Sequence, residues 1–258
     1  MIIFSAIAGI CGTGLGGLVA IILYKRSSEK MTCWMLSFAG GVMMSIVCFG
    51  LVPEAFALAN IAVNIAGILA GIVIIMALSR AVDNLTETTG VKLKIHETHE
   101  ELYHESQLIH SSSRMLRSGM LMLMAIGLHN IPEGLAIGAG GSHNFRLGAL
   151  LALMIAVHNI PEGMAIASPL LSGGIKRRKV LFLTALSGAP TLLGGIIGKF
   201  IGNISDYAVA ISLSAAGGAM LYIVFCEIIP QSIVMTKDRK ASLITLFGII
   251  IGLIVSII

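Results

Sequence analysis

Long runs of apolar residues separated by short polar linkers make up most of the chain. A helix needs about 20 predominantly apolar residues to cross a bilayer, so this pattern predicts eight membrane-spanning helices. They are expected at residues 1–24, 31–57, 60–82, 115–140, 147–172, 180–202, 207–234 and 241–258. The predicted fold class is an all-α membrane protein, and we expect the whole chain, 1–258, to form a single transmembrane domain.

Composition supports this prediction and excludes two other classes of protein. Hydrophobic residues make up 56% of the chain and charged residues only 12%, against about 25% charged residues in soluble domains. The net charge is +4, but the basic residues form short clusters between apolar runs and do not line a polar face. We therefore expect the lipid bilayer as a partner and no nucleic acid. The four cysteines form no CxxC pair, which argues against a zinc ribbon.

The distribution of Lys and Arg predicts how the spans are oriented. Cytoplasmic loops of membrane proteins carry an excess of basic residues. With eight spans and an external N-terminus, all of the 17 Lys and Arg except Arg146 and Lys199 fall on the inside. We therefore expect both termini to be extracytoplasmic and the longest linker, 83–114, to be a cytoplasmic loop.

Internal repeats add a constraint on the architecture. Ala39–Met43 in the second span matches Ala216–Met220 in the seventh at an offset of 177 residues, and each is followed by an Ile/Val-Pro-Glu/Gln triplet. The two spans are an odd number of crossings apart, so they must run in opposite directions. Inverted repeats around interrupted central helices are a common plan of secondary transporters. We predict that spans 1–3 and 6–8 are inverted repeats around a Pro-kinked central pair, spans 4 and 5.

That central pair carries a doubled motif, His-Asn-Ile-Pro-Glu-Gly, at 129–134 and 158–163. The His and Glu of each copy are four residues apart, so they share one face of a helix. The proline has no amide hydrogen to donate and tends to kink the helix, and the glycine lets a neighbouring backbone come close. Each copy therefore predicts an imidazole and a carboxylate that point the same way.

Two copies facing each other would supply imidazole, carboxylate and amide groups to one ion. The candidate metal-binding residues are His129, Asn130, Glu133, His158, Asn159 and Glu162. This mixed donor set suits Zn²⁺, with Fe²⁺, Mn²⁺ and Cd²⁺ as further candidates, and we expect the ion to be a transported substrate and not a cofactor. The structural alternative is that the histidines only hydrogen-bond the carboxylates. An ionisable residue in a span costs roughly 2.5–3.5 kcal/mol on insertion scales, and two antiparallel copies favour the functional interpretation.

Other polar residues are weaker candidates. Glu54 and Glu227 each lie close to a proline near one end of a span, so they are candidate steps on the transport path or acids near the membrane surface. Histidine-rich tracts can hold metal loosely, and a solvated acidic helix is the alternative for the long linker. Its four candidate ligands are His96, His99, His104 and His110.

Two other functions would use the same ligands. An intramembrane metallohydrolase would activate a water on the metal, but the chain lacks HExxH and offers no separate general base, and hydrolysis leaves the inverted repeat unexplained. We therefore do not expect this protein to be an enzyme. A passive metal channel would share the site, and the sequence does not separate it from a carrier.

The paired motifs, the eight expected spans and the His-bearing linker between the third and fourth of them resemble the ZIP (Zrt-, Irt-like protein) family of metal transporters. The second span, which ends in Val52-Pro53-Glu54-Ala55, resembles the prokaryotic GufA-like branch. The resemblance implies a central metal site at the six candidate residues in spans 4 and 5. It also implies uptake toward the cytoplasm across the cell membrane, alternating access by sliding of one helix group against another, and a homodimer.

One stretch departs from the family pattern. Many relatives carry a glutamate on the sixth span that completes a second metal position, whereas the matching stretch here is Ser187-Gly188-Ala189-Pro190-Thr191. Since no carboxylate is present there, we expect one full-strength metal position with a weaker, asparagine-lined neighbour.

Overall fold

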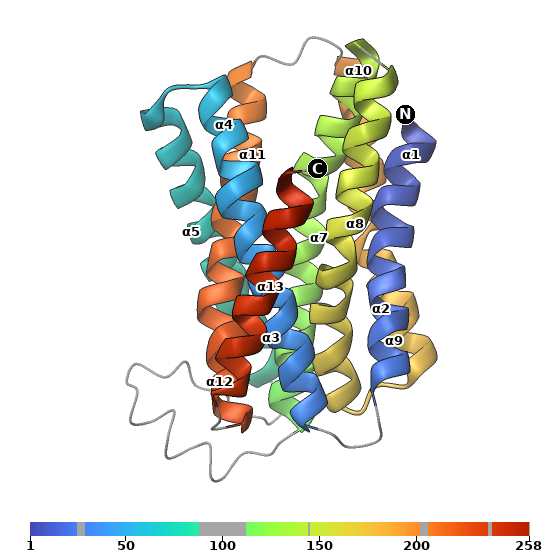
Figure 1. Ribbon diagram of the computed structural model, residues 1–258, viewed down its shortest axis with the longest axis vertical. Helices are drawn as coiled ribbons and strands as arrows, with labels where there is room; N and C mark the ends of the chain where they lie inside the picture. Colours follow the sequence, from blue (N-terminus) through green and yellow to red (C-terminus); the bar gives the residue numbers. More distant parts are fainter. Residues whose placement is uncertain (25–28, 88–111, 144, 202–205, 237–238, 258) are drawn as a thin grey trace.

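The computed structural model describes residues 1–24, 29–87, 112–143, 145–201, 206–236 and 239–257, and every regular element among them is a helix. In chain order the elements are α1 (Ile2–Ala6), η1 (Ile7–Cys11), α2 (Gly12–Leu23), α3 (Glu29–Ile46), η2 (Val47–Leu51), α4 (Val52–Leu58), α5 (Ile61–Glu87), α7 (Ser112–His143), α8 (Phe145–Ser172), α9 (Arg177–Ser187), α10 (Ala189–Ile201), α11 (Asp206–Tyr222), η3 (Ile223–Ile228), α12 (Ile229–Thr236) and α13 (Lys240–Ile257). They form one elongated bundle with α7 and α8 in its middle (Figure 1).

Seven of the described helices are long and apolar enough to cross a membrane, judged by length and composition. They are Ile2–Leu23, Lys30–Leu58, Ile61–Ala81, Met115–Ser142, Gly148–Ser172, Arg177–Phe200 and Val209–Met235. The last expected span coincides with α13, which is apolar but shorter, at Lys240–Ser256. The all-helical class is confirmed, and the count of eight spans stays a prediction.

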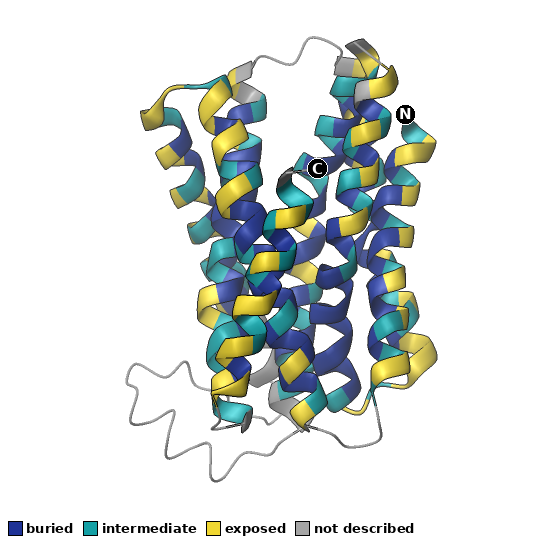
Figure 2. Ribbon diagram, in the orientation of Figure 1, coloured by how far each residue is buried: buried dark blue, intermediate teal, exposed yellow. Residues whose placement is uncertain are grey.

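The outer surface of the bundle is apolar. Large hydrophobic side chains such as Phe49, Phe182, Phe200 and Leu243 are more than half exposed, and the exposed positions lie on the outer faces of the helices while buried positions face the interior (Figure 2). A soluble monomer rarely shows so much contiguous apolar surface. The pattern is that of a multi-pass membrane protein.

The helical assignment changes outside the central pair. The central helices α7 and α8 continue through Pro132, Pro161 and Pro169, and a kink at these prolines stays a prediction. π-Helical turns or a break interrupt the first, second, sixth and seventh expected spans. Two of these turns, η2 and η3, each end two residues before a proline, Pro53 and Pro230. A proline has no N–H to donate to the preceding turn, so the local hydrogen bonding changes register there. The sixth expected span breaks at Gly188, which separates α9 from α10.

The helices form two groups, and the close backbone contacts that glycines permit lie within each group. In the site group (α1, η1, α2 and α7–α10), a Cβ at Gly134 would overlap the Thr191 carbonyl of α10. In the scaffold group (α3–α5, α11–α13, η2 and η3), a Cβ at Gly71 would overlap the Ala215 carbonyl of α11. The two groups meet mainly where α3 packs on α8 and α11 packs on α7.

The linker predicted at 83–114 is shorter at both ends in the structure. Residues 83–87 belong to α5 and residues 112–114 to α7, because the helices extend beyond their apolar cores. Arg117, which the charge count places on the inside and the predicted span 115–140 includes, lies within the second turn of α7. The four candidate ligands of this linker, His96, His99, His104 and His110, lie outside the described residues.

Candidate metal centre

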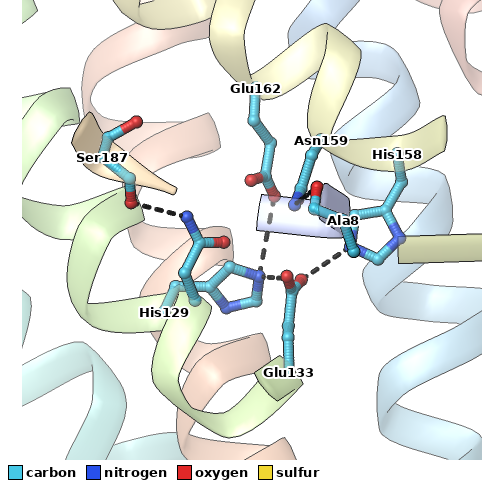
Figure 3. Close-up of polar contacts among 8 residues, drawn as sticks. Ala8, His129, Glu133, His158, Asn159, Glu162 and Ser187 are labelled. Carbon is cyan, nitrogen blue, oxygen red and sulfur yellow. Dashed lines mark hydrogen bonds and ion pairs between the residues drawn. The ribbon is translucent and has the colours of Figure 1, made fainter. Parts of the chain in front are cut away.

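The two central helices bring four of the predicted ligands together. The α7 residues His129 and Glu133 lie one turn apart, with 2.8 Å between His129 Nε2 and Glu133 Oε1. From α8, His158 Nε2 lies 2.6 Å from the same Glu133 oxygen, and Glu162 Oε1 lies 3.6 Å from His129 Nε2. The carboxylate of Glu133 thus sits between the two imidazoles, and Glu162 approaches the same His129 nitrogen from α8 (Figure 3).

All four side chains are buried in the interior of the bundle. The relative exposure is 2% for His129, 1% for Glu133, 7% for His158 and 0% for Glu162. Buried carboxylates are expensive unless their charge and hydrogen-bonding capacity are satisfied. Within the described residues, Oε2 of Glu133 and both carboxylate oxygens of Glu162 have no hydrogen-bond partner. The cluster therefore has acceptor capacity that a cation would satisfy.

The geometry of the cluster fits a small cation. One nitrogen of His129 and one oxygen each of Glu133 and Glu162 lie within 4.8 Å of one another. Ligands at zinc-type bond lengths of about 2.0–2.2 Å are separated by roughly 3.3–3.6 Å in a tetrahedron. Modest side-chain rotation would reach that spacing, with the 2.8 Å contact between His129 and Glu133 lengthening to admit the ion. Imidazole nitrogen and carboxylate oxygen are ligands that zinc and its neighbours accept.

The asparagines of the two motifs are held by the interrupted helices. Asn130 Nδ2 donates to the Ser187 carbonyl at 2.8 Å, and Asn159 Nδ2 donates to the Ala8 carbonyl at 3.1 Å. Because each amide nitrogen donates to a carbonyl, each amide oxygen remains a buried acceptor without a hydrogen-bond partner among the described residues.

These carbonyl acceptors come from irregular backbone. Ser187 is the last residue of α9. In a continuous helix its carbonyl would accept from the Thr191 amide, but that amide donates to the Gly188 carbonyl, next to Pro190, which has no N–H. The Ser187 carbonyl is therefore available to Asn130. Ala8 lies inside the π-helical turn η1. The sequence pointed to Ser187 only indirectly, through the Gly-Ala-Pro break, and no sequence signal pointed to Ala8.

The remaining described candidates lie apart from this cluster. Glu227 in η3 faces Arg117 of α7, at 3.4 Å between Oε2 and Nη1. Glu54 is in the first turn of α4 and is exposed. Neither belongs to the group of residues whose ligand atoms converge.

Taken together, the fold and the site define a polytopic helical membrane protein with a buried histidine–carboxylate cluster between two central helices. A family profile described as "ZIP Zinc transporter" matches residues 80–258. Among curated proteins, the zinc transporter ZupT of Akkermansia muciniphila is 33% identical over 265 residues, which cover 98% of this chain and 93% of that protein. ZupT of Streptococcus mutans is 29% identical, with 98% and 93% covered. The zinc transporter ZIP11 of Xenopus tropicalis is 38% identical over 149 residues, 55% of this chain and 44% of that protein.

The chain belongs to the ZIP zinc transporter family. It is accordingly a metal-transporting membrane protein and not an enzyme, which confirms the resemblance and the expected absence of catalysis. The GufA-like branch stays a prediction.

Proposed function

We propose that this protein carries Zn²⁺, and with lower preference Fe²⁺, Mn²⁺ or Cd²⁺, toward the cytoplasm through a site made by both HNIPEG motifs. The ligands in this proposal are His129, Asn130, Glu133, His158, Asn159 and Glu162. One observation carries this proposal. Buried oxygens on Glu133, Glu162 and both asparagines have no hydrogen-bond partner among the described residues, and they lie around two imidazoles. The names of the ZupT and ZIP11 relatives favour zinc as the substrate.

Each type of ligand has a separate role in this proposal. Glu133 and Glu162 balance the charge of the ion, and the imidazoles of His129 and His158 select a transition metal over Mg²⁺ or Ca²⁺, which prefer oxygen ligands. The absence of a carboxylate in Ser187–Thr191 favours a single strong position per chain. Zinc is then substrate in transit, so its ligands must release it as well as bind it.

Backbone contacts support the proposal that spans 1–3 and 6–8 are inverted repeats. In the scaffold group a Cβ at Gly41 would overlap the Thr245 carbonyl, and a Cβ at Gly218 would overlap the Ile68 carbonyl. The two contacts are equivalent, because both partners shift by 177 positions and exchange helices. In the site group, Gly163 meets the Thr13 carbonyl as Gly134 meets Thr191. The same two-fold relation would let the protein open to either side.

A carrier is favoured over a channel by the division into two groups. The close glycine contacts at Gly134 and Gly71 lie inside the groups, and sliding of the site group along the scaffold group would carry the ion across. We place the protein in the cell membrane with eight spans, both termini extracytoplasmic and the 83–114 segment cytoplasmic. α1 begins and α13 ends in the same half of the bundle (Figure 1), which favours an even number of spans with both termini on one side of the membrane. As in the family expectation, we propose a homodimer.

Uptake of radioactive zinc into proteoliposomes tests the proposal. The wild type should show saturable uptake, and the Glu133→Gln, Glu162→Gln double variant should lose it, because glutamine keeps the size of the side chain and removes the charge. The matched control is Glu54→Gln, which removes one exposed carboxylate outside the cluster. If this variant retains zinc uptake, Glu54 is not a step on the transport path. Competition by Fe²⁺, Mn²⁺ and Cd²⁺ orders the substrates. Equal flux in wild type, double variant and empty liposomes would contradict the proposed function.

A further inference from the structure

Polar side chains join the two helix groups at the end of the bundle where α7 begins. The Arg117 guanidinium of α7 lies 3.4 Å from the Glu227 carboxylate of η3 and donates to the Ser79 hydroxyl of α5 at 3.2 Å. The next residue, Ser118, donates its hydroxyl to Gln231 Oε1 of α12 at 2.9 Å. One turn of a site-group helix is therefore held by three helical segments of the scaffold group.

A second contact crosses the same boundary at the same end. The hydroxyls of Thr32 on α3 and Ser172 on α8 lie 2.7 Å apart, and Thr32 is fully buried. α3 begins at Glu29 and α8 ends at Ser172, so this contact and the Arg117 contacts lie at corresponding ends of the two central helices. Both helices that carry the metal ligands are thus tied to the scaffold group.

The charges make the first of these contacts strong. The side chains of Arg117 and Glu227 are each only 13% exposed, within a bundle whose outer faces are apolar. Separating such a pair leaves two poorly solvated charges, which is costly in a protein interior and more so in a membrane. The glycine contacts described above lie inside each group, so movement of one group along the other would leave them intact and break the polar contacts.

We propose that Arg117 and Glu227, with the hydroxyl contacts beside them, form a latch that holds the site group against the scaffold group and must open during every transport cycle. This inference rests on the proposed transport function. Arg117 does not act as a metal ligand, because it lies about three turns of α7 away from His129 and outside the converging group. We assign it a gating role. Its role is to set how often the two groups separate at this end.

A reversible disulfide across the boundary tests whether the groups must separate. Thr32→Cys and Ser172→Cys are introduced into a chain whose native cysteines, Cys11, Cys33, Cys48 and Cys226, are replaced by serine. The two hydroxyl oxygens lie 2.7 Å apart and each is one bond from its Cβ, so the Cβ atoms are at most about 5.5 Å apart, and a small adjustment reaches the roughly 3.5–4.5 Å of a disulfide. The matched control is Gly14→Cys with Ala185→Cys inside the site group, where a Cβ at Gly14 lies 3.4 Å from that of Ala185.

Oxidation of the boundary pair should lower zinc uptake at least tenfold, and a reductant should restore it. Oxidation of the control pair should change uptake by less than twofold. The latch is overturned if uptake persists with the boundary pair fully cross-linked. It is equally overturned if the control pair cross-links in the membrane and the boundary pair does not, because the groups would then not be held as described.

The role of Arg117 is tested by the extent of cross-linking itself. Arg117→Gln in the boundary-pair background should slow disulfide formation at least threefold, and so should Glu227→Gln. The double variant should be no slower than either, since both changes remove the same ion pair, and Arg117→Lys should restore most of the rate. Zinc affinity should stay within twofold in all of these variants. Cross-linking that is indifferent to Arg117→Gln would remove Arg117 from the latch.

The two proposals fail in different ways. If neither the wild type nor the cysteine-free chain takes up zinc, the proposed function fails, while the dependence of cross-linking on Arg117 still tests the contact. If that chain transports and the boundary disulfide has no effect, only the latch fails. A boundary-pair chain that also carries Glu133→Gln and Glu162→Gln should cross-link normally without transporting, which separates the latch from the metal ligands.

Discussion

The two central helices carry the same six-residue motif, but its charged side chains make different contacts in the two copies. Glu133 on α7 lies next to both imidazoles, at 2.8 Å and 2.6 Å. Among the described residues, Glu162 on α8 forms an ion pair with His129 alone, at 3.6 Å. The two buried carboxylates still lie close, with one oxygen of each within 4.8 Å of the other, and like charges at short range repel. The two imidazoles offset the charge of Glu133 more than that of Glu162, because both of them contact Glu133. Identical motifs therefore make a site with one shared carboxylate and one less compensated carboxylate.

The backbone around the two motifs stays symmetric in spite of this difference. Asn130 and Asn159 both donate to a carbonyl of an interrupted neighbouring helix, and Gly134 and Gly163 both contact a threonine carbonyl. Packing is set by shape, which the repeated sequence reproduces, while the charge arrangement depends on what faces each side chain. The following predictions test where the symmetry ends.

The largest difference is expected between the two glutamates. Glu133→Ala should weaken zinc binding roughly 100-fold, about 2.7 kcal/mol, because Glu133 is the carboxylate that both imidazoles contact. Glu162→Ala should weaken it about tenfold, about 1.4 kcal/mol. Equilibrium zinc binding to purified protein in detergent measures both, and equal losses would show that the asymmetry disappears when metal is bound.

A smaller difference is expected between the two histidines. Among the described residues, His129 lies near both carboxylates and His158 near Glu133. His129→Asn should therefore weaken zinc binding about threefold more than His158→Asn, a comparison matched in side-chain size. A larger loss for His158→Asn than for His129→Asn would mean that the ion binds on the α8 side of Glu133.

Acidification should weaken binding through both histidines. Protons compete with the metal for imidazole nitrogen, so affinity falls as pH drops. Between pH 7.5 and pH 5.5 we expect roughly tenfold or greater loss in the wild type, and a shallower dependence in His129→Asn and in His158→Asn. Zinc titrations across that range check this, and an unchanged slope in both variants would exclude the histidines as ligands.

No difference is expected between the two glycines. Gly134→Ala and Gly163→Ala each place a methyl group against a threonine carbonyl, and overpacking of this kind costs typically 1–3 kcal/mol. Both variants should lower the thermal unfolding midpoint by similar amounts, measured in detergent for each protein alongside the exposed-site control Leu243→Ala. If one variant lowered the unfolding midpoint clearly more than the other, the backbone packing around the two motifs would be asymmetric, as the charged contacts are.

The sequence predicted a large part of the fold and site because both depend on local patterns. Each expected span coincides with one or more helices, since apolar length is a local property. The convergence of His129, Glu133, His158 and Glu162 followed from four-residue spacing in two facing helices. Helix ends were less accurate, because α5 and α7 extend into polar sequence.

What the sequence determined by itself is the presence of long apolar helices and of a doubled ligand motif in the central two, because hydrophobic length and residue spacing act within a single helix. Only the tertiary structure decided which carboxylate both imidazoles contact, which backbone carbonyls hold Asn130 and Asn159, and that Arg117 turns inward to Glu227. These features depend on the relative position of helices far apart in the chain. Their energies come from burial and from partners on other helices, which residue order alone does not specify.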